Sequence, residues 1–163
     1  MPDRFLRTLR RLAMCFQAFE AYSDAHLRTT GLTPAQFDVI ATLGNQPGLL
    51  CKELGERTLI TKGTLTGVLD RLEARGLLSR VTCEGDRRGV FVSLTPAGQA
   101  LFAEVFPPHV EHLRRAFGAL KGSELERLES YLDRLTSRMV VDDIPSGRST
   151  PKSRMIAASR RVS

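Results

Sequence analysis

At 163 residues, of which 42% are hydrophobic, the chain is long enough to form one domain with a buried core. Its net charge of +6 and pI of about 9.8 favour a polyanionic partner. No stretch reaches the roughly 20 apolar residues of a membrane span, and the basic N-terminus lacks a small-residue cleavage site, so we expect a cytoplasmic protein without a membrane partner.

The N-terminal segment predicts a long amphipathic helix that ends near Gly31, a residue suited to a C-terminal cap. Its apolar residues recur at spacings of 4, 3, 4 and 3, at Phe5, Leu9, Leu12, Phe16 and Phe19. A second helix is predicted from Thr33-Pro34, an N-cap followed by proline at the first helical position. The buried residues of this second helix are expected to be Phe37, Ile40, Ala41 and Leu43.

The segment from Leu49 to Gly98 has the order of a winged helix-turn-helix: a short helix with Leu50 and Leu54, a turn, a longer helix and a hairpin. The helix from Thr61 to Arg75 has one apolar stripe, at Leu65, Val68, Leu69 and Leu72. Its outward residues are small at the N-terminal end, which permits a close approach to base edges, although glycines there also suit helix packing. The residues of this helix expected to bind DNA are Thr61, Lys62, Gly63, Thr64, Thr66, Gly67 and Arg71.

The hairpin is predicted from two strand-like runs, 77–82 and 90–94, whose connection has a glycine near each end. Adjacent arginines at its tip suit a narrow, electronegative minor groove, and a carboxylate two residues from the second arginine can orient it by a bidentate pair. We therefore predict wing contacts by Asp86, Arg87 and Arg88. A solvated turn with a weak surface ion pair is the alternative.

The C-terminal part predicts two more helices. Thr95-Pro96 opens the first of them, and Pro107-Pro108 is expected to break or sharply kink it. Ser123 is expected to cap the last helix, whose apolar residues are Leu125, Leu128, Leu132, Leu135 and Met139. The composition of residues 140–163 predicts a disordered, basic tail.

Both ends of the ordered chain thus carry near-heptad stripes, which favour packing against each other and against a second copy; packing within one chain is the alternative. The predicted dimerisation residues are Phe5, Leu9, Leu12, Leu125, Leu128, Leu132 and Leu135. The fold class is predicted to be mainly α with a small β-hairpin wing. The expected parts are an N-terminal dimerisation helix (1–32), a winged helix-turn-helix DNA-binding domain (33–98), C-terminal dimerisation helices (99–139) and the basic tail (140–163).

On these residues the chain resembles the MarR (multiple-antibiotic-resistance regulator) family of bacterial winged-helix repressors. The most specific segments are 31–37, 61–78, Asp86-x-Arg88 and Leu94-Thr95-Pro96-Ala97-Gly98. The resemblance implies a triangular homodimer that binds a pseudo-palindromic operator and is released by a small effector or an oxidant. It also implies that the helix 61–75 reads the major groove, while Arg88, oriented by Asp86, enters the minor groove.

The chain departs from the family pattern in two places. Some relatives carry a longer base-reading side chain at the position of Gly67, so direct readout is expected to be sparse. Pro107-Pro108 interrupts the helix that usually links the DNA-binding lobe to the dimerisation lobe.

The sequence offers three candidate signals for the release of the protein from DNA. The default is an aromatic or phenolic acid in a cleft lined by the first helix, the Thr33–Leu43 helix and the Pro96 helix. Cys15, which lies among aromatic residues, is a redox candidate, with a small buried apolar residue as the alternative. His109 and His112, three residues apart, are candidate zinc ligands, with solvated histidines as the alternative.

The predicted function is therefore a dimeric, sequence-specific transcriptional regulator, a repressor without a cofactor that a small effector releases from double-stranded operator DNA. The alternatives are a redox- or metal-responsive regulator of the same fold and a sequence-independent architectural DNA binder. No enzyme is expected, because the chain lacks a His-Glu-x-x-His motif, a phosphate-binding glycine loop and a nucleophile elbow.

Overall fold

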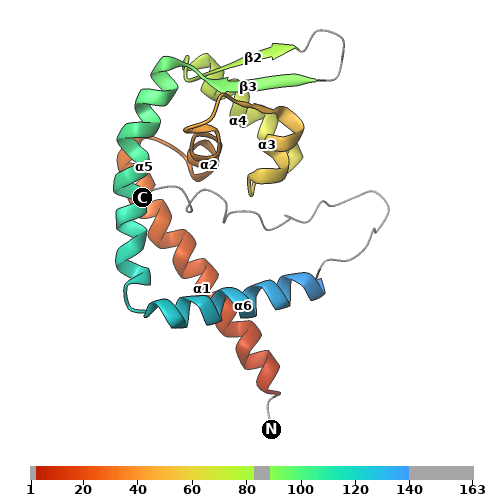
Figure 1. Cartoon of the computed structure of the whole chain (residues 1–163), viewed down its shortest axis with the longest axis vertical. Helices are drawn as coiled ribbons and strands as arrows, with labels where there is room; N and C mark the ends of the chain where they lie inside the picture. Colours follow the sequence, from red (N-terminus) through yellow and green to blue (C-terminus); the bar gives the residue numbers. More distant parts are fainter. Residues whose placement is uncertain (1–2, 83–88, 140–163) are drawn as a thin grey trace.

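A computed structural model describes residues 3–82 and 89–139, except for the side chain of Lys62 (Figure 1). The predictions on Asp86, Arg87, Arg88 and residues 140–163 lie outside the described residues. The elements are α1 (Arg4–Leu27), the 3₁₀ turn η1 (Arg28–Thr30), α2 (Pro34–Leu43), β1 (Leu49–Leu50), α3 (Cys51–Arg57), α4 (Lys62–Ala74), β2 (Leu78–Thr82), β3 (Val90–Leu94), α5 (Pro96–Phe117) and α6 (Gly122–Met139). This arrangement confirms the predicted fold class. No helix in the described part of the chain is both long and apolar enough to cross a membrane.

The three strands form an antiparallel sheet in the order β1-β3-β2. The predicted hairpin is confirmed, with Leu78 opposite Leu94 and Thr82 opposite Val90. The edge strand β1 was not predicted, and it takes Leu50 out of the expected short helix. Two residues are too few for an alternating pattern, so β1 depends on the pairing of Leu49 with Val92 in the folded chain.

One apolar core joins α2, α3, α4, the sheet and the first half of α5. The predicted stripe of α4 is confirmed, because Leu65, Val68, Leu69 and Leu72 are all buried. On α2, Ile40 and Leu43 are buried as expected, but Val39 is buried in place of Ala41, and Phe37 is only half-buried. The difference arises because α2 lies between α4 and α5 and buries more than one narrow stripe.

The predicted helix starts at Thr33 and Thr95 are confirmed. The Thr33 hydroxyl accepts a hydrogen bond from the Gln36 N–H (3.2 Å), and the Gln36 side chain accepts one from the Thr33 N–H (3.1 Å). The Thr95 hydroxyl accepts from the N–H of Gly98 (3.1 Å). Gly31 also acts as a cap, with φ of 69°, but it ends η1 and not α1 itself.

The predicted N-cap at Ser123 is wrong. Helix α6 already begins at Gly122, and the carbonyl of Lys121 accepts the first helical hydrogen bonds. The Glu124 carboxylate accepts a hydrogen bond from the Lys121 N–H at 2.8 Å, which satisfies a donor at the helix start without a serine or threonine cap.

The predicted break at Pro107-Pro108 is also wrong, because α5 continues from Pro96 to Phe117 (Figure 1). Proline removes a hydrogen bond to the carbonyl four residues earlier. Both prolines, together with Ala103 and Glu104 that precede them by four residues, are exposed, so water can replace the two lost bonds.

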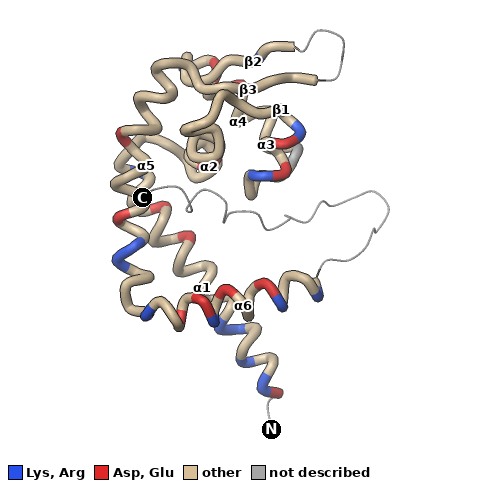
Figure 2. Tube along the Cα trace, viewed as in Figure 1, with Lys and Arg blue, Asp and Glu red and all other residues tan. Residues whose placement is uncertain are grey.

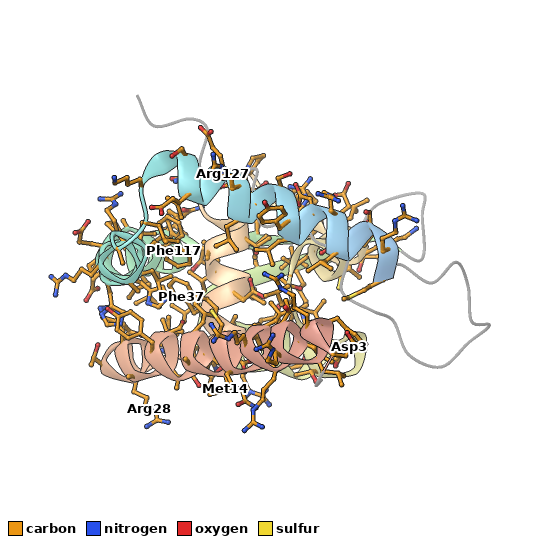
Figure 3. The ribbon with its side chains drawn as sticks, turned by 90° about the horizontal axis from the view of Figure 1, so that it is seen from below. Asp3, Met14, Arg28, Phe37, Phe117 and Arg127 are labelled. Atoms are coloured by element: carbon orange, nitrogen blue, oxygen red, sulfur yellow. The ribbon has the colours of Figure 1, made fainter. Side chains whose placement is uncertain are left out.

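Helices α1 and α6 extend away from this core (Figure 1). Leu27 is the one fully buried residue of α1, and α6 has none. Seen from below, α1 and α6 run along two sides of this end of the molecule, with α5 almost end-on beside them, and Met14 points away from α6 (Figure 3). The single chain therefore leaves the apolar residues of both helices largely uncovered.

Candidate nucleic-acid interface

The turn between α3 and α4 sets the start of the proposed recognition helix. The Thr58 hydroxyl donates to the carbonyl of Leu54 (2.9 Å), and a carboxylate oxygen of Asp38 on α2 accepts from the Leu59 N–H (2.8 Å). Burial raises the pKa of Asp38, while the bond from Leu59 acts in the opposite direction. Sequence reasoning missed Asp38, because its partner lies 21 residues further along the chain.

The exposed face of α4 carries the residues predicted to bind DNA. Thr61, Gly63, Thr64, Thr66 and Arg71 are exposed and Gly67 is half-buried. The Thr61 and Thr64 hydroxyls are hydrogen-bonded at 3.0 Å, which joins the cap residue to the first turn. A Cβ atom placed on Gly63 would meet nothing within 4 Å, so the alternative that the glycines serve helix packing is wrong for Gly63.

Gly67 has a different environment. A Cβ atom there would lie 3.6 Å from a guanidinium nitrogen of Arg71, so the Arg71 side chain lies back along the helix over this glycine. The space that a longer residue would occupy at position 67 is partly taken by Arg71. The predicted Lys62 contact lies outside the described side chains.

The hairpin of β2 and β3 lies next to α4 (Figure 1). Arg80 on β2 pairs with Asp70 at 2.8 Å and with Glu73, both on α4. Sequence reasoning missed this contact, although the short separation of Glu73 and Arg80 across one turn could have suggested it.

The predicted dimerisation residues are exposed in the single chain, apart from the half-buried Leu125. The exposed fractions are 61% for Phe5, 51% for Leu9, 37% for Leu12, 38% for Leu128, 39% for Leu132 and 41% for Leu135. Figure 2 adds that Lys and Arg occupy the N-terminal half of α1, whereas charges of both signs alternate along α6. Packing within the chain, the alternative considered above, does not cover these residues.

A small cavity of about 220 Å³ lies between the C-terminal end of α1, η1 and α5. It is lined by His26, Thr29, Thr30, Leu101, Glu104, Val105 and Pro108. Two of the three elements expected to line the effector cleft therefore meet there. Helix α2, the third, contributes no lining residue.

The alternative that the two histidines are solvated is wrong for His109, whereas His112 is half-buried. His109 is only 3% exposed, and its ring lies against His26 (Nδ1–Nδ1 3.1 Å), Ser23 (Nε2–Oγ 3.3 Å) and the ring of Phe37. Burial, followed by the nearby His26 and His112, lowers the pKa of His109 to about 4. The His112 ring stacks on Tyr22, with ring centres 4.0 Å apart.

These histidines join α1 to α5. Within residues 3–82 and 89–139, no three His, Cys, Asp or Glu side chains are arranged to hold a metal ion. Cys15 is exposed on α1, so its alternative as a small buried residue is also wrong.

Comparisons with known proteins address the fold and the family. A family model described as MarR family matches residues 30–89. The transcriptional regulator PecS of Dickeya dadantii is 36% identical over 112 residues, which cover 67% of this chain and 68% of PecS. The chain belongs to the MarR family.

Two solved structures extend the comparison of this MarR-family chain. Sco3205 of Streptomyces coelicolor, a MarR-family regulator solved in complex with DNA, shares the fold with a TM-score of 0.77 and 24% identity over 84% of this chain and 88% of Sco3205. BpsR of Bordetella bronchiseptica, solved in a study of how 6-hydroxynicotinic acid regulates its DNA binding, is 31% identical with a TM-score of 0.64, over 82% and 99% of the two chains. The MarR-family chain is thus a DNA-binding transcriptional regulator and not an enzyme, as predicted.

Proposed function

We propose that the chain is a homodimeric repressor in which α4 of each copy enters the major groove of one half of a pseudo-palindromic operator. The exposed outer face of α4 carries this proposal. The hydroxyls of Thr64 and Thr66 and the guanidinium of Arg71 are donors for phosphates or base edges. We propose from the sequence that Asp86, Arg87 and Arg88 supply the wing contacts.

We propose that a second copy of the chain covers the exposed apolar residues of α1 and α6. Apolar faces of this extent are unusual on a monomer and typical of an interface. The four arginines of α1 (Arg4, Arg7, Arg10 and Arg11) have possible partners in the acidic residues of α6 (Glu124, Glu126, Glu129 and Asp133), which alternate with Arg127, Arg134 and Arg138. A twofold dimer also matches two DNA half-sites one helical turn apart.

Leu132→Glu is expected to convert the dimer to a monomer, because it places a charge in the proposed apolar interface. Operator affinity should fall at least roughly a hundredfold, because each chain then holds one half-site alone. Sedimentation equilibrium measures the mass of the assembly, and fluorescence anisotropy measures the affinity for the operator. Ser130→Glu adds the same charge on the opposite side of α6 and should leave both unchanged. A dimeric Leu132→Glu variant would contradict the proposed interface.

The cavity between η1 and α5 is the proposed effector site. Its volume of about 220 Å³ lies below the roughly 300–1,000 Å³ of drug-sized sites, so it suits a single-ring acid. The His26 ring offers a donor to a carboxylate, Leu101 and Val105 offer apolar contacts to a ring, and Glu104 can accept from a phenolic hydroxyl. The Thr29 and Thr30 hydroxyls donate to the carbonyls of His26 and Leu27, so they offer acceptor oxygens to the ligand. The likeness to BpsR supports a small aromatic acid as the ligand.

Fluorescence anisotropy with DNA from upstream of the protein's own gene and with a shuffled duplex tests the function. We expect at least roughly a thousandfold tighter binding to the upstream DNA, and release by a hydroxylated aromatic acid. Arg71→Ala should weaken binding about tenfold and lower the slope of log affinity against log salt by about one, because one phosphate contact is lost. Arg127→Ala removes an equal charge on α6 and is the matched control.

An architectural DNA binder is the second candidate, and the small outward residues Gly63, Gly67 and Ala74 favour it because they offer few side chains for base readout. Equal affinity for the upstream and shuffled duplexes, with equal salt slopes, would support this candidate and contradict the repressor.

A further inference from the structure

Arg80 joins the first strand of the wing to the recognition helix. Its Nη2 lies 2.8 Å from Oδ1 of Asp70 and also pairs with Oε2 of Glu73, to which its Nε donates a second hydrogen bond at 2.9 Å. The Arg80 side chain is 28% exposed, whereas those of Asp70 and Glu73 are 56% and 38% exposed. One guanidinium therefore holds two carboxylates that lie one helical turn apart.

The position of these carboxylates is unusual for a helix that approaches DNA. At 100° per residue, Asp70 lies on the same outward side of α4 as Gly63 and Gly67, at the centre of the proposed DNA face. Two free carboxylates there would repel phosphates. The hydrogen bond from Arg80 is the main cause that lowers the pKa of Glu73, so Glu73 stays ionised and paired.

The contact also constrains the hairpin. Arg80 lies opposite Val92 in the β2–β3 register, and Val92 is fully buried in the core of the lobe. The backbone of Arg80 is therefore fixed by the sheet, while its side chain is fixed by α4. A strand so tied cannot rotate against α4 without breaking charged hydrogen bonds.

We propose that Arg80 is a positioning residue for DNA recognition, which neutralises part of the charge of Asp70 and Glu73 and holds the wing strand at a set angle to α4. This inference rests on the proposed function, since it assumes that the outer face of α4 meets DNA. Arg80 acts through the two carboxylates and does not itself touch DNA. An isolated surface pair contributes little, but three groups joined by directed hydrogen bonds form a network.

A double-mutant cycle on the full chain tests this proposal. Arg80→Gln is combined with a neutral background, D70N/E73Q, and operator affinity is measured by anisotropy for all four proteins. We expect Arg80→Gln to weaken binding at least tenfold in the wild-type background, because it frees both carboxylates. In D70N/E73Q the same change should alter affinity less than threefold, because there is no charge left to neutralise.

Two further variants distinguish the proposed role of Arg80 from a direct contact with DNA and from a general effect of charge. Arg80→Lys should restore part of the affinity, because it keeps the charge but loses the bidentate geometry. Arg114→Gln breaks the exposed Arg114–Glu111 pair on α5 and should leave binding unchanged. Equal losses in both backgrounds would show that Arg80 contacts DNA directly and would overturn the proposal. Absence of specific binding by the wild-type protein would instead overturn the proposed function, and a melting temperature for each variant identifies any loss of folding.

Discussion

Replacing Gly98 with alanine is expected to lower the free energy of unfolding by roughly 3 kcal/mol or more. A Cβ atom at this position would lie 1.9 Å from the carbonyl oxygen of Leu77 and 3.0 Å from its carbonyl carbon. Both are backbone atoms, so no change of rotamer relieves the contact. The same carbonyl accepts a hydrogen bond from the Thr95 N–H at 3.1 Å, so the chain cannot move apart there without losing the junction between β3 and α5.

Urea denaturation followed by circular dichroism measures this effect. Gly122→Ala is the matched control, because a Cβ atom at Gly122 meets nothing within 4 Å. Alanine favours a helix over glycine by up to about 1 kcal/mol, so the control should be neutral or slightly more stable. Wild-type stability of Gly98→Ala would show that α5 does not approach Leu77 as closely as described.

Acidification from pH 7 to pH 4 is expected to destabilise the fold by up to about 3 kcal/mol through His109. Burial and the adjacent histidines lower the pKa of His109 from 6.5 to about 4. Between these two values the unfolded chain binds more protons than the folded chain, so stability falls as the pH falls. Above pH 6.5 both states are neutral at His109, and the stabilisation from its burial is fully present.

The expected change acts on the contact between α1 and α5. A proton on His109 would place charge beside His26, whose pKa is itself lowered, first by burial and then by His112 and Arg115. His109→Gln keeps a hydrogen-bonding side chain but does not titrate. Thermal melts at several pH values should show a steeper loss of stability for the wild type than for His109→Gln. Parallel curves for the two proteins would exclude His109 as the cause.

Much of the local structure was predictable, because it depends on residues close together in the chain. The Thr33 cap needs only Gln36, and the Thr95 cap needs only Gly98. The buried stripe of α4 follows from a period of 3.6 residues. The candidate DNA face was predictable for the same reason, since the outward residues of a helix are those that its buried stripe leaves over.

Some sequence motifs could be recognised from the sequence, but the contacts that require their residues could not. The Leu94–Gly98 segment carries the family resemblance, but the need for glycine at its last position comes from the Leu77 carbonyl, which only the fold places there. The same holds in part for Arg80: its short separation from Glu73 suggests one partner, but only the fold shows that Asp70 meets it as well.

The sequence by itself determined the order of the α-helices and the β2–β3 hairpin, the caps of α2 and α5, and the family of the protein. The tertiary structure alone decided that β1 pairs with β3, that α5 passes unbroken through Pro107-Pro108, and that His26 meets His109 across 83 residues. The physical reason is the separation along the sequence of the residues that interact. Caps and helical periods are set by neighbours within one or two turns, whereas burial, pKa shifts and ion pairs depend on which distant segments the core brings together.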